Sequence, residues 1–205
     1  MSRRPTQSAR RRREEERRRK ERRRQQFVIG GIAAAVVAVI LAVILASGSS
    51  KSPVVASSND PLLAPASGGP QGQPIDGMTC GAETLIFHIH AHLAMFVDGQ
   101  PRMVPAGIGI PGSCLYWLHS HTSDGVIHME SPVQRTFSLG NYFDVWGQPL
   151  SATQVGPATG PVTAYVNGQR YSGNPRDIPL EAHTNVQLDV GADVAPKTFT
   201  FPSGL

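Results

Sequence analysis

A run of consecutive uncharged and almost wholly apolar residues, FVIGGIAAAVVAVILAVILA at positions 27–46, divides the chain into parts that must be considered separately. At about 1.5 Å of rise per residue, a helix of this length spans the roughly 30 Å hydrocarbon core of a bilayer. A cleaved signal peptide is the alternative, but its apolar segment is usually only about 7 to 15 residues long and its basic region is short. The run therefore predicts a single transmembrane helix.

The basic charge of the chain is concentrated before this run. Residues 1–26 carry 13 of the 19 Lys and Arg residues and 4 of the 15 Asp and Glu residues, so the remainder is acidic. Because basic segments stay on the cytoplasmic side, we expect a cytoplasmic N-terminus and an extracytoplasmic C-terminal part. The tail would also attract anionic lipid headgroups. No aromatic residue is interleaved with the arginines for base stacking, so no nucleic-acid binding is expected.

Residues 47–74, which follow the apolar run, are dominated by Ser, Gly, Pro and Ala and have no sustained hydrophobic period. Such a composition predicts a flexible, extended linker. A folded domain is expected to occupy residues 75–205. A segment of roughly 130 residues is long enough to bury one hydrophobic core.

Asx-Gly dipeptides lie between strand-like segments of this domain at three places, in VDGQ at 97–100, SDGV at 123–126 and VNGQ at 166–169. Asp-Gly and Asn-Gly between strand-like segments are strong signals for β-hairpins. We therefore predict a mainly β fold, an antiparallel sandwich or small barrel. The segment SLGNYFDVWG at 138–147 is either a helix that begins after Ser138 and stops at Gly147, or a loop with a single turn.

The segment FHIHAHLAMF at 87–96 places His88, His90 and His92 at alternate positions. Alternate side chains of a strand share a face, so the three imidazoles point one way while Met95 and other apolar side chains point toward the core. His88 and His92 are roughly 13 Å apart along such a strand, too far to share one ion through bonds near 2.1 Å. A single ion would take an adjacent pair and further ligands from elsewhere.

Those further ligands are expected from CLYWLHSHTSDGVIHMESP, residues 114–132. If its Asp-Gly pair forms a two-residue turn, His121 lies opposite His128 and His119 lies opposite Glu130, all on one face. Trp117 has the same parity and could wall the site, although core packing is the commoner role for tryptophan.

Six of the seven histidines thus fall on two hairpin-like segments, together with a carboxylate. Neutral imidazole is a common ligand for copper and zinc, and copper(II) stands first in the order of divalent affinities. His183, in a turn-like stretch, is expected to be a surface or turn histidine. The alternative to a metal site is a structural polar network. The predicted copper or zinc ligands are His88, His90, His92, His119, His121, His128 and Glu130.

Cys80 and Cys114 each precede one of the two His-bearing segments. In an extracytoplasmic compartment an even number of cysteines favours a disulfide, which would tie the two segments together. Two free thiolates acting as metal ligands are the alternative.

The segments FHIHAHLAMFVDGQPR, CLYWLHSHTSDGVIHMESP and LGNYFDVWGQPLS also resemble those of an uncharacterised family of His-rich, exported or membrane-anchored bacterial domains. The resemblance covers about residues 75–205. It implies no activity.

Three functions are compatible with these patterns. The first is a membrane-anchored, extracytoplasmic copper- or zinc-binding domain for metal handling, sensing or delivery. The second is a hydrolytic or redox metalloenzyme, which requires an open coordination position and an acid or base such as Glu130 beside it. The third is a metal-free interaction domain. No set of catalytic residues and no protein partner can be named from the pattern.

Overall fold

The computed structural model of the protein describes Lys20 and residues 61–83 and 86–205. The chain divides into two compact units, Met1–Ser50 and Lys51–Leu205, and the strands of the described residues all belong to the second unit. The predicted transmembrane run at 27–46 lies outside the described residues, as does the basic tail apart from Lys20. Among the residues that are described, no helix is both long and apolar enough to cross a membrane.

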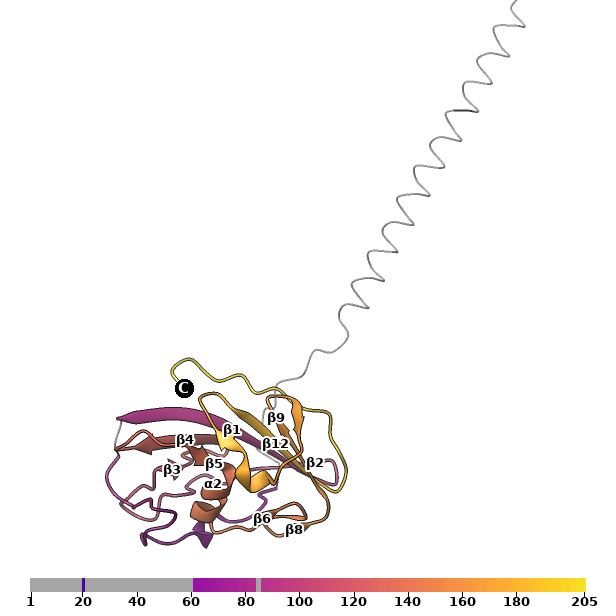
Figure 1. The fold of residues 1–205 in the computed structure, drawn as a ribbon. Helices are drawn as coiled ribbons and strands as arrows, with labels where there is room; N and C mark the ends of the chain where they lie inside the picture. Colours follow the sequence, from indigo (N-terminus) through magenta and orange to yellow (C-terminus); the bar gives the residue numbers. More distant parts are fainter. Residues whose placement is uncertain (1–19, 21–60, 84–85) are drawn as a thin grey trace, which may run out of the picture. The chain divides into compact units, whose positions relative to one another are not determined.

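A seven-stranded mixed sheet forms the centre of the fold (Figure 1). Its strands, in chain order, are β1 (Phe87–Val97), β2 (Gln100–Arg102), β3 (Leu118–His119), β4 (Val126–Ser131), β9 (Val162–Val166), β10 (Gln169–Tyr171) and β12 (Asn185–Val190). They lie in the order β10-β9-β12-β1-β4-β3, and β2 pairs with β1 as well. The pairing of β1 with β12 is parallel, and the other pairings in this sheet are antiparallel.

The prediction of a mainly β fold is confirmed, but two of its details are wrong. The central sheet is mixed rather than antiparallel, and in the described residues it is open, ending at β10 and β3 instead of closing into a barrel. The hairpin signals mark only local connections, whereas the parallel pair joins His92 to Asn185, far apart in the sequence. Two small antiparallel sheets accompany the central sheet. One consists of β5 (Phe137–Ser138) and β11 (Pro179–Leu180), and the other consists of β6 (Leu150–Ser151), β7 (Gln154–Val155) and β8 (Ala158–Thr159).

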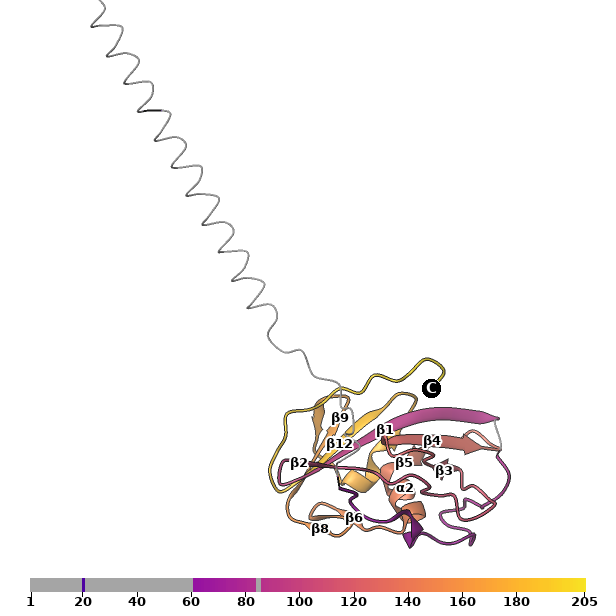
Figure 2. The ribbon, with the colours of Figure 1, turned by 180° about the vertical axis from the view of Figure 1, so that it is seen from behind.

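Helix α2 (Leu139–Trp146) packs against one side of the central sheet, and both views of the ribbon show it there (Figures 1 and 2). Ser138 forms a capping box with Asn141 at its start, and Gly147 ends it in the left-handed conformation, with φ of 71°. The predicted helix is therefore confirmed, and the single-turn loop is excluded. Two short 3-10 helices, η1 (Ala66–Gly68) and η2 (Pro175–Asp177), complete the helical elements of residues 61–205 that are described.

The apolar face of β1 lies in the hydrophobic core, as its alternation predicts. Leu93 and Met95 are buried in one cluster with Met129 of β4 and with Phe143 and Trp146 of α2. The core is therefore enclosed between the sheet and the helix, and the alternate residues of β1, which include its histidines, point to the other side of the sheet.

Two of the three predicted hairpins form with two-residue turns, and the third forms with a longer connection between β3 and β4. Val97 pairs with Gln100 and Val166 with Gln169, each across a two-residue turn. At the third position β3 ends at His119 and β4 begins only at Val126, so His119 lies opposite His128 instead of Glu130. The predicted register is wrong by two residues, which preserves the face of every side chain.

Local side-chain hydrogen bonds explain this longer connection. The Asp124 carboxylate accepts a hydrogen bond from the Val126 backbone N–H at 3.0 Å. The Ser120 hydroxyl donates to the Val126 carbonyl at 2.7 Å and also lies 2.8 Å from the Tyr142 hydroxyl. These bonds satisfy the backbone of the connection without ladder pairing.

The predicted linker at 47–74 ends earlier than its composition indicates. Leu63 is buried in the core, and its backbone N–H donates to the Met103 carbonyl at 3.1 Å. The Trp146 indole N–H donates to the Pro65 carbonyl at 2.9 Å. Residues 61–74 therefore belong to the folded unit, because they cover one end of α2 and the core beneath it.

The segment that follows β12 crosses the side of the sheet opposite α2 (Figures 1 and 2). The Lys197 backbone N–H donates to the Gln187 side chain at 2.8 Å, and the Phe199 ring stacks on His92 at 3.8 Å between centroids. This segment covers the part of the outer face formed by β12 and the second half of β1.

Replacing Gly147 by alanine is expected to destabilise the fold more than replacing Gly72. Both glycines have a positive φ, of 71° and 91°, and this conformation costs alanine about 1 to 2 kcal/mol at either position. Only at Gly147 would the added Cβ overlap the Gly68 carbonyl oxygen, whereas at Gly72 it meets nothing within 4 Å. We expect the overlap to add about 1 to 3 kcal/mol, measured by chemical denaturation. Equal losses in the two variants would contradict this packing of α2 on residues 61–74.

Candidate metal centre

The register of three neighbouring strands gathers the histidines. In the antiparallel pair of β1 and β4, His88 lies opposite Glu130 and His90 lies opposite His128. In the pair of β3 and β4, His119 lies opposite the same His128. All these residues share one face of one sheet, because directly opposed residues point the same way. The two predicted imidazole faces therefore meet side by side within a sheet.

The ring nitrogens converge to short separations around the first half of β1. His90 Nε2 lies 3.0 Å from His88 Nε2 and 3.1 Å from His128 Nδ1. Glu130 Oε1 lies 3.1 Å from His88 Nε2 and 3.5 Å from His128 Nδ1. Two nitrogens that each bind one ion at about 2.1 Å, with an angle between about 90° and 110°, are themselves roughly 3.0 to 3.4 Å apart. These separations are therefore those of ligands around a common ion.

A second pair of imidazoles adjoins this group. His121 follows directly after β3, and its Nε2 lies 3.1 Å from His119 Nε2. His119 Nε2 in turn lies 3.9 Å from Glu130 Oε1. The pair thus faces the same carboxylate as the group on β1.

Hydrogen bonds alone satisfy this arrangement poorly. A ring nitrogen of histidine carries either one hydrogen or one lone pair, directed in the plane of the ring. His90 Nε2, however, has two nitrogen neighbours at nearly equal distances, and His88 Nε2 has one nitrogen and one carboxylate neighbour. A cation between these atoms would satisfy all of them at once.

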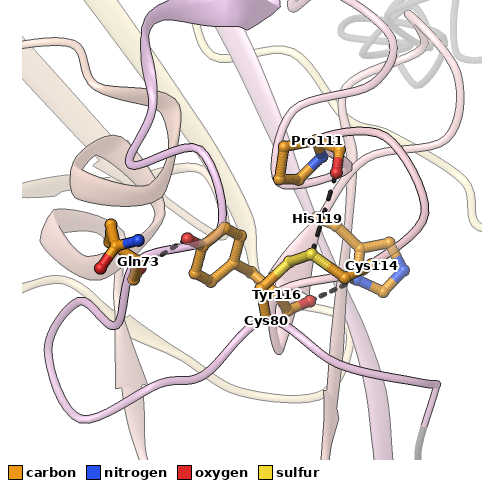
Figure 3. The surroundings of a disulfide bond; sticks show 6 residues. All are labelled: Gln73, Cys80, Pro111, Cys114, Tyr116 and His119. Carbon is orange, nitrogen blue, oxygen red and sulfur yellow. Dashed lines mark hydrogen bonds between the residues drawn. A yellow bond between two sulfur atoms is a disulfide. The ribbon is translucent and has the colours of Figure 1, made fainter.

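The orientation of His119 is set by its second nitrogen. His119 Nδ1 lies 2.9 Å from the Tyr116 carbonyl oxygen, which can only accept (Figure 3). The hydrogen is therefore on Nδ1, and the lone pair of Nε2 points into the cluster. A backbone carbonyl that holds the outer N–H in this way is typical of metal-binding histidines.

The Tyr116 carbonyl belongs to a loop that the predicted disulfide holds. Cys80 and Cys114 are bonded, with their Cα atoms 5.4 Å apart, so the prediction is confirmed and the thiolate alternative is wrong. The Tyr116 hydroxyl donates to the Gln73 carbonyl at 2.5 Å (Figure 3). In the chain-entropy model a bridge across this loop stabilises the fold by roughly 3 to 4 kcal/mol.

Three of the clustered imidazoles are uncharged at neutral pH. Burial, and to a smaller extent the neighbouring imidazoles, lower the pKa of His90 to about 4, that of His119 to about 4 and that of His128 to about 3. Neutral rings have free lone pairs, which metal binding requires. His88, with a side chain 36% exposed, and the exposed His121 leave the cluster open to solvent.

Glu130 is the one carboxylate that the sequence placed in the site, and it is 4% exposed. Burial, followed by the nearby Glu83 carboxyl, raises the pKa of Glu130 to about 7. Its Oε2 is buried and has no hydrogen-bond partner among the described residues. An unpaired buried carboxylate oxygen is costly, and a bound cation would remove that cost.

Glu83 is a neighbour of the site that the sequence pattern did not indicate. It lies in the segment between Cys80 and the His-bearing strand, where no periodicity assigns its side chain to a face. The disulfide at Cys80 is the feature that could have suggested its position, because it brings this segment toward β3.

His92 does not join the cluster, although strand parity assigned it to the same face. Its Nδ1 lies 2.9 Å from the Asn185 side-chain oxygen, and its Nε2 lies 3.1 Å from the Asp124 carbonyl oxygen. Its ring is buried beneath Phe199. These two contacts and the stacked Phe199 ring leave His92 outside both groups of possible ligands.

The remaining side chains singled out by sequence have structural surroundings. His183 is exposed in a turn, with its Nε2 2.9 Å from the Leu205 carbonyl oxygen. Trp117 packs against the core, and the Arg135 guanidinium lies 5.7 Å from its ring centroid.

The donors form two groups that could each hold a metal ion. Within each group the ligand atoms all lie within 4.8 Å of one another. Imidazole nitrogens with one carboxylate oxygen suit zinc and copper(II), and the disulfide leaves no thiolate at the described cysteines. The groups are His88, His90 and His128, and His119, His121, His128 and Glu130.

The chain matches no protein-family model, no curated protein and no solved structure. The resemblance to His-rich bacterial domains, and the role of the clustered residues as metal ligands, therefore remain predictions.

The metal-free protein is expected to lose stability as the pH falls below about 6.5. His90, His119 and His128 stay neutral in the fold to about pH 4 or below, whereas the unfolded chain protonates them near their ordinary pKa of 6.5, so unfolding takes up protons in between. Glu130 acts in the opposite direction, because the fold holds a proton that the unfolded chain releases between pH 4.5 and about 7. Near pH 5.5 the net uptake on unfolding should be about two protons.

Denaturant unfolding of chelator-treated protein at several pH values between 4.5 and 7 measures the slope of the free energy of unfolding against pH. Glu130→Gln should steepen it, since the opposing carboxyl is lost. A free energy of unfolding that rises toward pH 5 would contradict the neutral, buried state of the three imidazoles.

Proposed function

We propose that the protein is a membrane-anchored, extracytoplasmic domain that binds copper or zinc for metal handling, sensing or delivery. The observation that supports this most strongly is the convergence of five imidazoles on one buried carboxylate, with nitrogen separations of 3.0 to 3.1 Å. Neutral rings, an oriented His119 tautomer and the unpartnered Glu130 oxygen support the same conclusion.

The accessibility of the cluster favours handling or delivery over a permanent structural role. Structural zinc sites are closed by four protein ligands, whereas His88 and His121 leave this cluster in contact with solvent. The fold around it is held by a disulfide and by its own hydrophobic core. A metal ion is therefore not needed for folding and can be bound and released.

The proposed anchor rests on the apolar run at 27–46 and the basic residues before it. A disulfide in the folded part agrees with an oxidising compartment outside the cytoplasm. In the sequence, residues 47–60 connect the proposed anchor to the described folded unit.

Copper(II) or zinc(II) should bind the full-length, detergent-solubilised protein with a sub-micromolar Kd, equivalent to more than about 8 kcal/mol. His128→Ala should weaken binding most, by a hundredfold or more, because His128 is the one residue common to both donor groups. Isothermal titration calorimetry on chelator-treated protein measures both values.

His183→Ala is the matched control, because it removes an imidazole that lies outside both groups. Thermal unfolding without metal checks that the variants keep their fold. Wild-type protein with a Kd above about a millimolar for both metals would overturn the proposal and leave a structural polar network in a metal-free interaction domain.

Protease added to intact cells should digest the domain at 61–205 and spare the basic tail, because the tail is expected on the cytoplasmic side. Immunodetection with one tag at each end follows the two parts. Recovery of the full-length protein in the soluble fraction after lysis would contradict the anchor.

A further inference from the structure

The cluster contains more donors than one copper or zinc ion can bind in this geometry. Ligands at about 2.1 Å from one ion are at most about 4.2 Å apart, and zinc sites usually have four ligands. Five imidazoles and a carboxylate are present, and the pair His88–His90 falls in a different group from the pair His119–His121. A single ion at one pair therefore leaves the other pair without a cation.

Each pair has the geometry of ligands to its own ion. The two Nε2 atoms are 3.0 Å apart in His88–His90 and 3.1 Å apart in His119–His121. With bonds of about 2.1 Å, these separations correspond to an angle near 90° at a metal ion. Both pairs are of the His-x-His type, and they come from β1 and from the end of β3, on the two sides of β4.

The side chains of β4 lie between the pairs. Glu130 Oε1 is 3.1 Å from His88 Nε2 on one side and 3.9 Å from His119 Nε2 on the other. Its Oε2 is buried without a hydrogen-bond partner in the described structure, on a side chain only 4% exposed. Because Oε1 faces both pairs, this carboxylate can bridge an ion at one pair to an ion at the other.

We propose that the site binds two divalent metal ions side by side, one at His88 and His90 and the other at His119 and His121, bridged by Glu130. This inference rests on the proposed metal-binding function. His128 belongs to both donor groups and completes the coordination of one of the ions. Two-metal sites with a separation of about 3.5 to 4 Å polarise and bind oxygen anions, so a small anionic ligand is expected to complete the open positions beside His88 and His121.

Copper(II) added to chelator-treated, full-length protein tests the proposal. Calorimetry and elemental analysis after gel filtration should find two copper ions per chain, and electron paramagnetic resonance should show a magnetically coupled pair. The double variants His88→Ala/His90→Ala and His119→Ala/His121→Ala should each bind one ion and give the spectrum of an isolated copper(II). His183→Ala, the control outside the cluster, should keep two coupled ions.

The outcomes separate this inference from the proposed function. One ion per wild-type chain, or two ions without magnetic coupling, overturns the two-ion site and leaves the metal-binding function standing. No binding of copper(II) overturns the two-ion site, and no binding of zinc(II) in the same assay would overturn the metal-binding function as well. Loss of one ion in His183→Ala would place the second ion elsewhere and also overturn the proposal. If a double variant does not fold, the stoichiometry and spectrum of the wild-type protein still decide.

Discussion

The antiparallel pairing of β1 with β4 is the interaction on which the rest of the structure depends. Its backbone hydrogen bonds fix a register in which His90 faces His128 and His88 faces Glu130 on the outer side. The same register buries the alternate apolar residues against α2 on the inner side. Because strand side chains alternate, a slip of one residue would move every imidazole into the core and expose the apolar face. The hydrophobic core therefore enforces the positions of the site residues.

Burial of polar groups gives the cluster its chemical character. His119 and Glu130 are buried away from water, so the imidazole loses its proton more readily and the carboxylate holds its proton more tightly than in solution. A carbonyl fixes the outer nitrogen of His119, but Glu130 Oε2 has no such partner among the described residues. Such an imbalance is unfavourable in a metal-free fold, and a bound cation offsets it.

One part of the outer face of the sheet is open to solvent, and the segment after β12 covers another part. Around the first half of β1 the imidazoles face solvent through His88 and His121, whereas around the second half the segment after β12 packs onto the strand. Phe199 covers His92 there and turns a potential ligand into a packed, hydrogen-bonded side chain. A domain held by a disulfide and a hydrophobic core can leave one end of this face open to solvent without losing its fold.

The sequence by itself determined the mainly β class, the faces of the His-bearing strands, the turns of two hairpins, the disulfide and six of the residues that meet at the cluster, and it offered helix α2 as one of two alternatives. These features follow from short-range physics, since alternation assigns a side chain to a face, Asx-Gly favours a tight turn, and Ser and Gly favour the two ends of a helix. Tertiary structure decided the parallel pairing of β1 with β12, the two-residue change in the β3–β4 register, the exclusion of His92 and the approach of Glu83. Each of these depends on contacts between segments distant in the chain, whose free energy comes from burial and packing that no local pattern encodes.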